Sequence, residues 1–175
     1  MGRSLGAPTG TNASGSEAPV VPAVWQTGGM RAFVPLLLTD LTAAKMPVRE
    51  LLAVPTSTSH QHPDEVEELE YHLSLEASLA SLELIRDAEP SPKSAMRRVV
   101  AAVELATAPT DGALEWEALA ALLVDDEDAT EDVAHICALE DQQAADEAVE
   151  QLLENHPLVW WDRAERARVA ALTEV

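Results

Sequence analysis

Arg97-Arg98-Val99-Val100-Ala101-Ala102-Val103-Glu104-Leu105 is the stretch of sequence that decides the fold. It is an almost unbroken apolar run, and its valines are β-branched residues that pack well on a pleated surface. The run therefore predicts a buried strand. Pro109 to Gly112 follow it closely and predict a turn.

We predict four further strands, which lie at residues 31–38, 50–55, 118–124 and 158–161. Pro35 removes an amide donor from the first of them, which indicates a bulge or an edge position. The stretch from Leu114 to Val124 has the propensity of a helix. It ends abruptly in Val124-Asp125-Asp126, as a strand does before a capping loop, so we predict a strand from about Ala118.

Helices are predicted between these strands, and Pro63–Asp87 is the strongest of them, with proline and acids in its first turn. The others are a short helix that Thr39 or Asp40 caps and Pro47 ends, one that starts at a capping box Asp128-Ala129-Thr130-Glu131, one through Ala145 to Leu153, and a terminal one from Arg163 to Leu172. Alternating strands and helices predict a single-domain, layered α/β fold with a mixed or largely parallel sheet of about five strands.

The long helix has two apolar faces. One stripe should bury against the sheet, and it consists of Val66, Leu69, Leu73, Ala77, Ala80 and Leu84. A second stripe lies opposite and consists of Tyr71, Leu75, Leu79 and Leu82. A helix that is apolar on both sides needs cover on both, either from another element of this chain or from a second copy in a homodimer.

The formal net charge is −20, and it is unevenly distributed. From Val99 to Asp162 the chain has seventeen Asp and Glu and no Lys or Arg. Such a surface repels phosphate backbones and anionic lipids, so we expect no direct nucleic-acid or membrane binding. Two explanations remain for the acids: solubility through self-repulsion, or docking of a basic protein partner, even as a nucleic-acid mimic.

Residues 1–29 differ in composition from the rest, with six of the seven glycines and no apolar periodicity. We expect a disordered tail, or an upstream extension of a reading frame that starts at Met30, ahead of an acidic α/β domain at residues 30–175. Cys137 is the one cysteine, so no intramolecular disulfide can form and a reducing cytoplasm is the expected compartment. No segment is long and apolar enough to span a membrane.

Five short motifs stand out along the chain: Met30 to Leu36, Glu67 to Tyr71, Arg98 to Val103, Val124 to Asp126 and Leu158 to Trp161. Together they resemble an uncharacterised actinobacterial family of unknown function, whose members start with a Met-Arg-x-Phe/Tyr-Val-Pro-Leu motif. The similarity runs from Met30 to about Asp162 and implies no activity. The stretch from Thr56 to Pro63 departs from the family pattern and carries Ser59-His60-Gln61-His62.

Two sets of residues are candidates for ion binding. The first is the acidic cluster where a strand feeds a helix, formed by Asp125, Asp126, Asp128, Glu131 and Asp132. Ligands often bind at such a strand end and carboxylates suit Mg²⁺ or Ca²⁺, but helix capping and solvation explain the cluster without an ion. The second is His60 with His62, which could hold a transition metal; an exposed capping loop explains them without one.

Trp160 and Trp161 are adjacent in a predicted strand and should face opposite sides of the sheet. If helices cover both faces of the sheet, both tryptophans are core residues. If one face is open, one tryptophan becomes an aromatic anchor for a partner, beside Arg163, Arg166 and Arg168. No glycine-rich phosphate loop or catalytic triad occurs, and His135 and Cys137 point to different sides of a helix.

We therefore expect no cofactor, and no motif assigns a biochemical function. Two hypotheses remain. We favour a non-catalytic protein-interaction or regulatory module. The alternative is a small metal-assisted hydrolase that uses the acidic cluster, and it needs an arrangement of residues that the sequence does not display.

Overall fold

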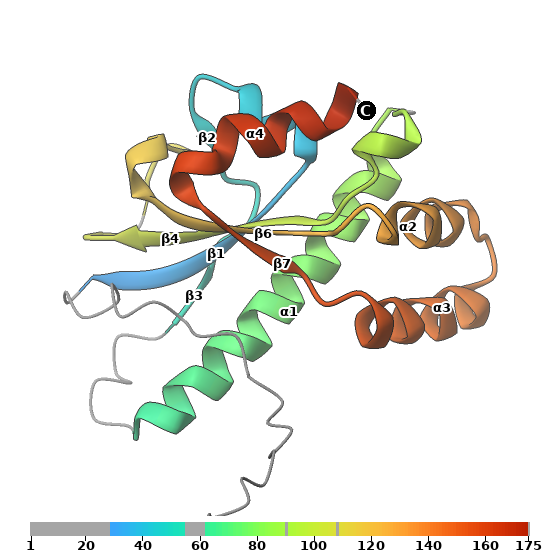
Figure 1. Ribbon diagram of the computed structural model, residues 1–175. Helices are drawn as coiled ribbons and strands as arrows, with labels where there is room; N and C mark the ends of the chain where they lie inside the picture. Colours follow the sequence, from blue (N-terminus) through green and yellow to red (C-terminus); the bar gives the residue numbers. More distant parts are fainter. Residues whose placement is uncertain (1–28, 55–61, 90, 108, 175) are drawn as a thin grey trace, which may run out of the picture.

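A computed structural model describes residues 29–54, 62–89, 91–107 and 109–174 (Figure 1). Its strands are β1 (Met30–Leu36), β2 (Met46–Pro47), β3 (Leu52–Ala53), β4 (Val99–Leu105), β5 (Ala113–Leu114), β6 (Leu119–Val124) and β7 (Val159–Asp162). Its α-helices are α1 (Pro63–Asp87), α2 (Ala129–Ala138), α3 (Gln142–Asn155) and α4 (Arg166–Ala170). The 3₁₀ turns include η1 (Leu38–Thr42), η3 (Lys93–Ala95) and η5 (Arg163–Glu165).

The main sheet has five strands in the order β3-β1-β4-β6-β7, and β2 pairs with β5 in a separate two-stranded sheet. Every pair of neighbours in the main sheet is antiparallel. The predicted mixed or largely parallel sheet is therefore wrong, although the α/β class, the five strands and the long helix are confirmed.

The first source of the error is the position of strand β1, which lies between the two strands that a crossover helix connects. Strands β3 and β4 are both antiparallel to β1, so they are parallel to each other, and α1 connects them as a crossover helix does. The strand–helix–strand unit expected from the sequence is thus present. Its two strands flank β1 instead of pairing with each other.

The second source is the connection from β6 to β7, which contains two helices. Helices α2 and α3 pack against each other as a hairpin, which is seen at the side of the sheet in Figure 1. A single helix would carry the chain to the far end of the sheet and allow a parallel strand. A helical hairpin brings the chain back to the same end of the sheet at which β6 finished, so β7 must run antiparallel to β6.

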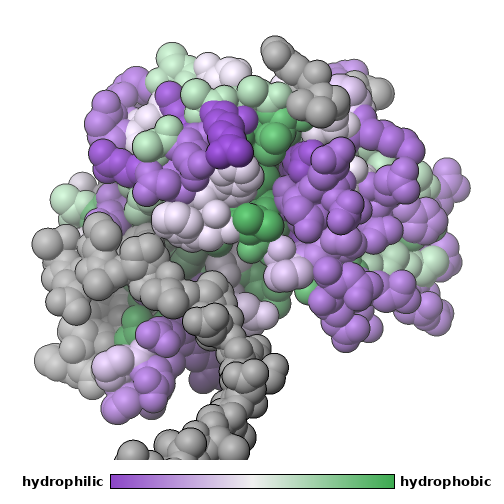
Figure 2. Space-filling model, viewed as in Figure 1, coloured by the Kyte–Doolittle hydropathy of each residue, from purple (hydrophilic) through white to green (hydrophobic). Residues whose placement is uncertain are grey.

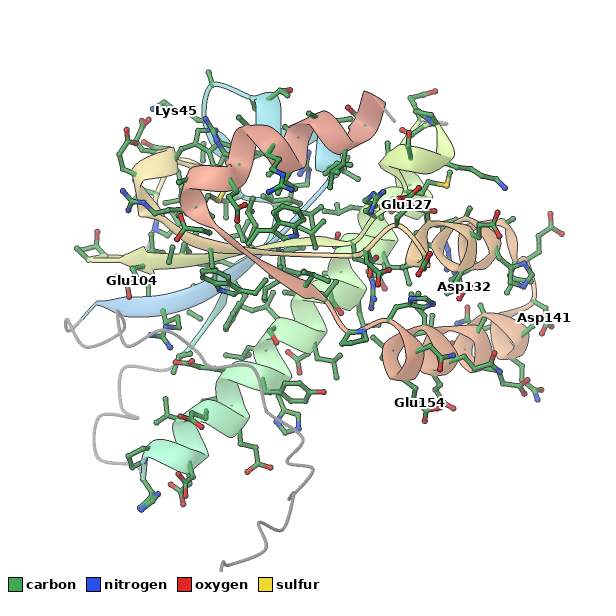
Figure 3. All side chains as sticks on the ribbon, in the orientation of Figure 1. Lys45, Glu104, Glu127, Asp132, Asp141 and Glu154 are labelled. Atoms are coloured by element: carbon green, nitrogen blue, oxygen red, sulfur yellow. The ribbon has the colours of Figure 1, made fainter. Side chains whose placement is uncertain are left out.

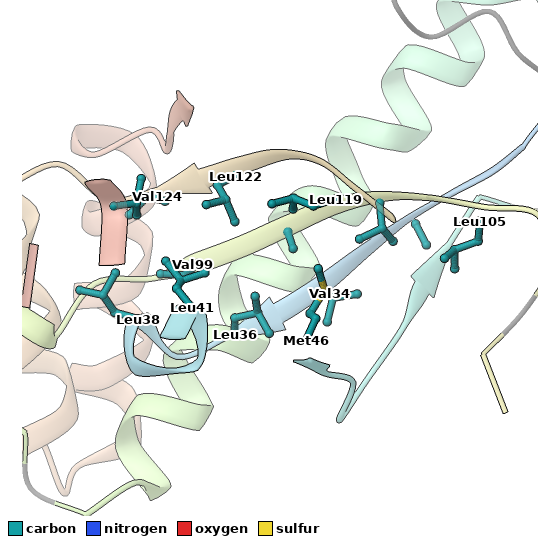
Figure 4. Packing of buried hydrophobic residues seen from close by; sticks show 14 residues of the cluster. Val34, Leu36, Leu38, Leu41, Met46, Val99, Leu105, Leu119, Leu122 and Val124 are labelled. Carbon is teal, nitrogen blue, oxygen red and sulfur yellow. The ribbon is translucent and has the colours of Figure 1, made fainter. Parts of the chain in front are cut away.

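The sheet is covered differently on its two faces. On one face, buried side chains from β1, β4 and β6 pack with η1, β2 and α4 (Figure 4), and the cluster consists of Ala32, Val34, Leu36, Leu38, Leu41, Met46, Val99, Ala101, Val103, Leu105, Leu119, Leu122, Val124 and Val169. On the other face, helix α1 packs on β1, β3 and β4. Its cluster with the sheet consists of Phe33, Ala77, Val100, Ala102 and Ala121.

The buried stripe of α1 is rotated from the predicted one. It consists of Ala77, Ser78, Ser81, Leu82 and Ile85, so only Ala77 of the predicted sheet-facing stripe is fully buried. The hydroxyl of Ser81 explains why a polar residue lies there: it donates to Leu36 O at 2.8 Å and accepts from Val99 N–H at 2.9 Å. Ser81 thereby satisfies backbone groups at the ends of two neighbouring strands.

Cover for the second stripe of α1 comes partly from this chain. Leu82 packs in a cluster with α2 and α3 residues, which include Val133, Ile136 and Leu152. Tyr71, at the other end of the stripe, is 65% exposed. Of the two kinds of cover that the sequence allows, this chain itself therefore covers Leu82, whereas Tyr71 stays exposed.

Three shorter elements also differ from the predictions. The strand predicted at residues 50–55 is reduced to Leu52–Ala53, and the helix after Thr39 is the 3₁₀ turn η1, where Asp40 accepts from Leu37 N–H at 2.8 Å. The terminal helix is broken into η5, α4 and a last 3₁₀ turn. Pro35 lies beyond the two residues of β1 that pair with β3, so its missing N–H interrupts no ladder on that side.

Candidate functional site

The acidic stretch from Asp125 to Asp132 lies where the sequence placed it, between the end of β6 and the first turn of α2. The residue that caps α2 is different from the predicted one. Asp126 Oδ1 accepts from Ala129 N–H at 3.1 Å, whereas Asp128 makes no capping hydrogen bond. Glu131 and Asp132 stand in the first turn, where negative charge stabilises a helix.

Asp125 is buried and forms an ion pair with Arg98. The two side chains are 0% and 1% exposed, and Arg98 Nη2 donates to Asp125 Oδ1 at 2.6 Å. Arg98 Nε lies 3.0 Å from Asp125 Oδ2, which also accepts from the Arg98 backbone N–H at 2.8 Å. Both carboxylate oxygens are thus occupied, and Asp125 joins the start of β4 to the end of β6 without reaching solvent.

His156 completes this junction, and the sequence reasoning missed it. Its carbonyl accepts from Arg98 Nη2 at 2.7 Å. Its ring lies between two carboxylates, with Nε2 3.1 Å from Asp132 Oδ2 and Nδ1 3.6 Å from Asp126 Oδ1. The histidine therefore connects the end of α3 to the start of α2 (Figure 3 labels Asp132).

This arrangement separates the ligands that a metal would need together. The two nitrogens of His156 face different carboxylates, and Asp125 is committed to Arg98. Within the described ranges, no group of three or more His, Cys, Asp and Glu side chains is placed to hold a metal ion. Of the histidine pair, His62 caps α1 at an exposed position, and His60 lies outside the described residues.

The two helices α2 and α3 and the loops at their ends form an acidic surface, which we call the acidic hairpin (residues 126–155). Its exposed carboxylates are Asp126, Glu127, Asp128, Glu131, Asp132, Glu140, Asp141, Asp146, Glu147, Glu150 and Glu154. No Lys or Arg occurs in this segment. Figure 2 shows it as a hydrophilic region, and in Figure 3 the labelled Glu127, Asp141 and Glu154 point outward.

A groove of about 260 Å³ lies between α2 and α3. Its polar lining includes Asp132, His135, Glu147, Gln151 and Asn155, and Ile136, Leu139, Ala144 and Ala148 form its apolar part. A groove lined by both carboxylates and apolar side chains suits a long cationic side chain, which combines an apolar stem with a charged end.

The two tryptophans of β7 face opposite sides of the sheet, as predicted. Trp160 is opposite Leu123 and Trp161 is opposite Leu122 in the register with β6. Trp161 packs against the large core cluster, and the Arg168 guanidinium lies 5.2 Å from its ring centroid. Trp160 is 42% exposed, because α1 packs on β1, β3 and β4 and leaves this end of the sheet face open.

A second cleft, also about 260 Å³, lies at the end of α1 between η1, η3 and α2. Cys137 lines it and is half-buried. Burial raises the pKa of the Cys137 thiol, and the nearby charge of Arg86 only partly opposes this. A thiol that ionises less readily is a poor nucleophile, which agrees with the interpretation of Cys137 as a small packing residue.

Comparison with known proteins connects this chain to one family. A family model described as a family of unknown function, DUF6912, matches residues 30–169. No curated protein and no solved structure matches the chain. No helix of the described residues is long and apolar enough to cross a membrane. The match covers the strands, α1 and the acidic hairpin, and the chain therefore belongs to the DUF6912 family.

Proposed function

We propose that this protein is a non-catalytic interaction module whose acidic hairpin docks a basic segment of a protein partner. The observation that carries the proposal is the groove between α2 and α3, which Asp132 and Glu147 help to line, in a hairpin without Lys or Arg. Lys and Arg side chains are the natural occupants, since they combine an apolar stem with a charged end. Asp126, Asp128, Glu131 and Asp132 belong to this surface, which repels phosphodiesters and anionic lipids.

The charge also defines how the partner is bound. Exposed carboxylates steer a basic partner over a distance set by ionic strength, and they contribute more to the association rate than to affinity. Affinity must come from the few side chains that enter the groove, where Glu147 is exposed and Asp132 is shared with His156. The proposal therefore requires binding that weakens with salt but is not abolished by it.

The metal-assisted hydrolase has less support from the same geometry. It requires several carboxylates of the cluster to converge on one ion. Asp125 is bonded to Arg98, and Asp126 and Asp132 lie on opposite sides of the His156 ring.

We also propose that the functional unit is the domain from Met30 onward in the cytoplasm, and that the family is actinobacterial with members that begin at this Met-Arg-x-Phe/Tyr-Val-Pro-Leu motif. The match that starts at residue 30 supports this boundary.

The test uses a synthetic lysine-rich peptide as the probe, titrated into the full chain by calorimetry over a salt series. We expect Glu147→Gln, which removes a carboxylate from the groove, to weaken binding about tenfold, since one hydrogen bond to a charged group contributes about 1.5–3 kcal/mol. The control Glu67→Gln removes the same charge from an exposed position on α1 and should have little effect. Equal losses in the two variants would show nonspecific attraction and contradict the proposal.

A further inference from the structure

Strand β7 is an edge strand with a free side. It pairs with β6 from Ala121–Asp162 to Val124–Val159, and among the described residues no strand lies on its other side. In an antiparallel ladder only alternate residues bond to a given neighbour. The remaining N–H and C=O groups of β7 therefore point away from the sheet and are available to another strand.

Exposed apolar side chains are concentrated on this strand and lie on both faces of it. Three large hydrophobic residues are exposed in the described part of the chain: Tyr71 on α1, and Val159 and Trp160 on β7 at 41% and 42%. Val159 and Trp160 are consecutive, so they point to opposite faces. A helix docked on one face would cover one of them, whereas an added strand covers both.

The charges at the two ends of β7 identify the occupant. The acidic hairpin ends at Asn155, just before β7, with Glu154 in its last turn. Arg163 follows β7 directly, and Arg168 stands one turn later. An antiparallel strand of the same sequence would bring its own arginine end to the acidic end of this copy, and the reverse contact would form by symmetry.

We propose that β7 pairs with β7 of a second copy about a twofold axis, which joins two sheets into one. Residues opposite each other in an antiparallel pair face the same side, so the register must place even positions opposite even ones. With Trp160 opposite Trp160 of the second copy, Val159 meets Trp161 on the other face, and every exposed apolar residue of the strand is covered. This register also brings Arg163 opposite Pro157 of the second copy, three residues after Glu154.

The net charge of −20 opposes self-association only weakly at physiological salt. The Debye length there is about 8 Å, so distant carboxylates of the two copies are screened from each other. Contacts across the strand pair decide the outcome; these are apolar in the centre, and at each end Arg163 of one copy lies on the side of Glu154 of the other copy. The acidic hairpins lie outside the strand pair, so a dimer would present two of them, and this inference stands independently of what the hairpins bind.

Sedimentation equilibrium of the full chain tests this pairing over a concentration series from about 1 to 500 μM. We expect a mass that approaches twice 18.8 kDa. The variants Val159→Lys and Trp160→Lys should be monomeric at every concentration, because each places a lysine charge in the apolar centre of the strand pair. Tyr71→Lys changes the third exposed hydrophobic residue in the same way but lies on α1, so it should leave the dimer intact.

A charge exchange tests the orientation. Arg163→Glu and Glu154→Lys should each weaken the homodimer, and an equal mixture of the two variants should restore association, since opposite charges then meet at both ends. Hydrogen exchange of the unmodified chain provides a readout without variants: protection of the β7 amides should rise with concentration. A monomer at every concentration, which leaves β7 to a different partner, or a dimer that survives Val159→Lys and Trp160→Lys, would overturn the inference.

Discussion

The β1–β4 half of the sheet and the β6–β7 half are similarly apolar in sequence but differ in cover. Val34, Leu36, Val99 and Val100 are 0% exposed, because α1 lies on one face and η1 with α4 on the other. On the face that α1 covers, Trp160 of β7, two strands away from β4, is 42% exposed. Burial on that face therefore follows the position of α1, and Trp160 lies beyond its reach.

The largest effect is expected from a substitution that breaks the contact between the two halves of the sheet. Arg98→Met leaves the Asp125 carboxylate buried without its partner, which we expect to cost about 3–5 kcal/mol in the free energy of unfolding. Urea denaturation measures this value. The double variant Arg98→Met/Asp125→Leu should recover much of the loss, since removal of both charges avoids an unpaired one. A single variant as stable as the unmodified protein would show that the pair does not hold β4 against β6.

A matched pair of substitutions in β6 compares the two faces directly. Leu122 is 0% exposed on the covered face, and Leu123 is half-buried on the face that α1 leaves open. We expect Leu122→Ala to cost about 2–5 kcal/mol and Leu123→Ala clearly less, because less packing is lost. Thermal or urea unfolding of both variants checks the order, and equal losses would mean that the open face is covered after all.

A smaller effect is expected at the edge itself. Trp160→Thr places a β-branched residue, which suits a strand, where a ring that is 42% exposed is removed, so the monomer should lose about 1 kcal/mol or less. Trp161→Thr removes a ring that packs on the core cluster and should cost more. The comparison requires dilute protein, where any dimer has dissociated. The reverse order of the two losses would contradict the assignment of the faces.

The smallest effect concerns Cys137, which reports on the covered region between α1 and α2. Burial raises the pKa of its thiol, so alkylation by iodoacetamide should be slower than for a free cysteine at mildly alkaline pH and should accelerate at higher pH. As pH rises, the unfolded chain loses the thiol proton first, so this group lowers stability until the folded thiol also ionises. A rate equal to that of the urea-unfolded chain would contradict the burial.

The sequence predicted the elements better than their connections. Apolar runs located β1, β4, β6 and β7 within a few residues, and the proline and acids at its first turn located α1 from Pro63 to Asp87. The direction of the strands could not be read in the same way. It depends on whether one helix or a hairpin fills a connection, and on which strands flank β1, neither of which a local pattern records.

The positions of the candidate residues were predicted only in part, because local patterns do not record which distant residues meet. The acidic stretch and the opposite orientations of Trp160 and Trp161 follow from position along the chain, and the structure agrees with both. The Arg98–Asp125 pair was missed because it exists only when β4 and β6 are antiparallel neighbours, with Val99 opposite Val124. His156 has no sequence signal, since its ring and carbonyl contact residues from three other parts of the chain.

The hairpin connection between β6 and β7 has a consequence for how this domain can diversify. The hairpin of α2 and α3 leaves the sheet and returns to it at the same end of the strands. Whole turns can therefore be added to or removed from both helices together while every strand keeps its direction. A change in the length of α1, by contrast, would displace β4 from the middle of the sheet. Natural variation among homologous chains should therefore accumulate in the size and charge of the hairpin while α1 keeps a constant length.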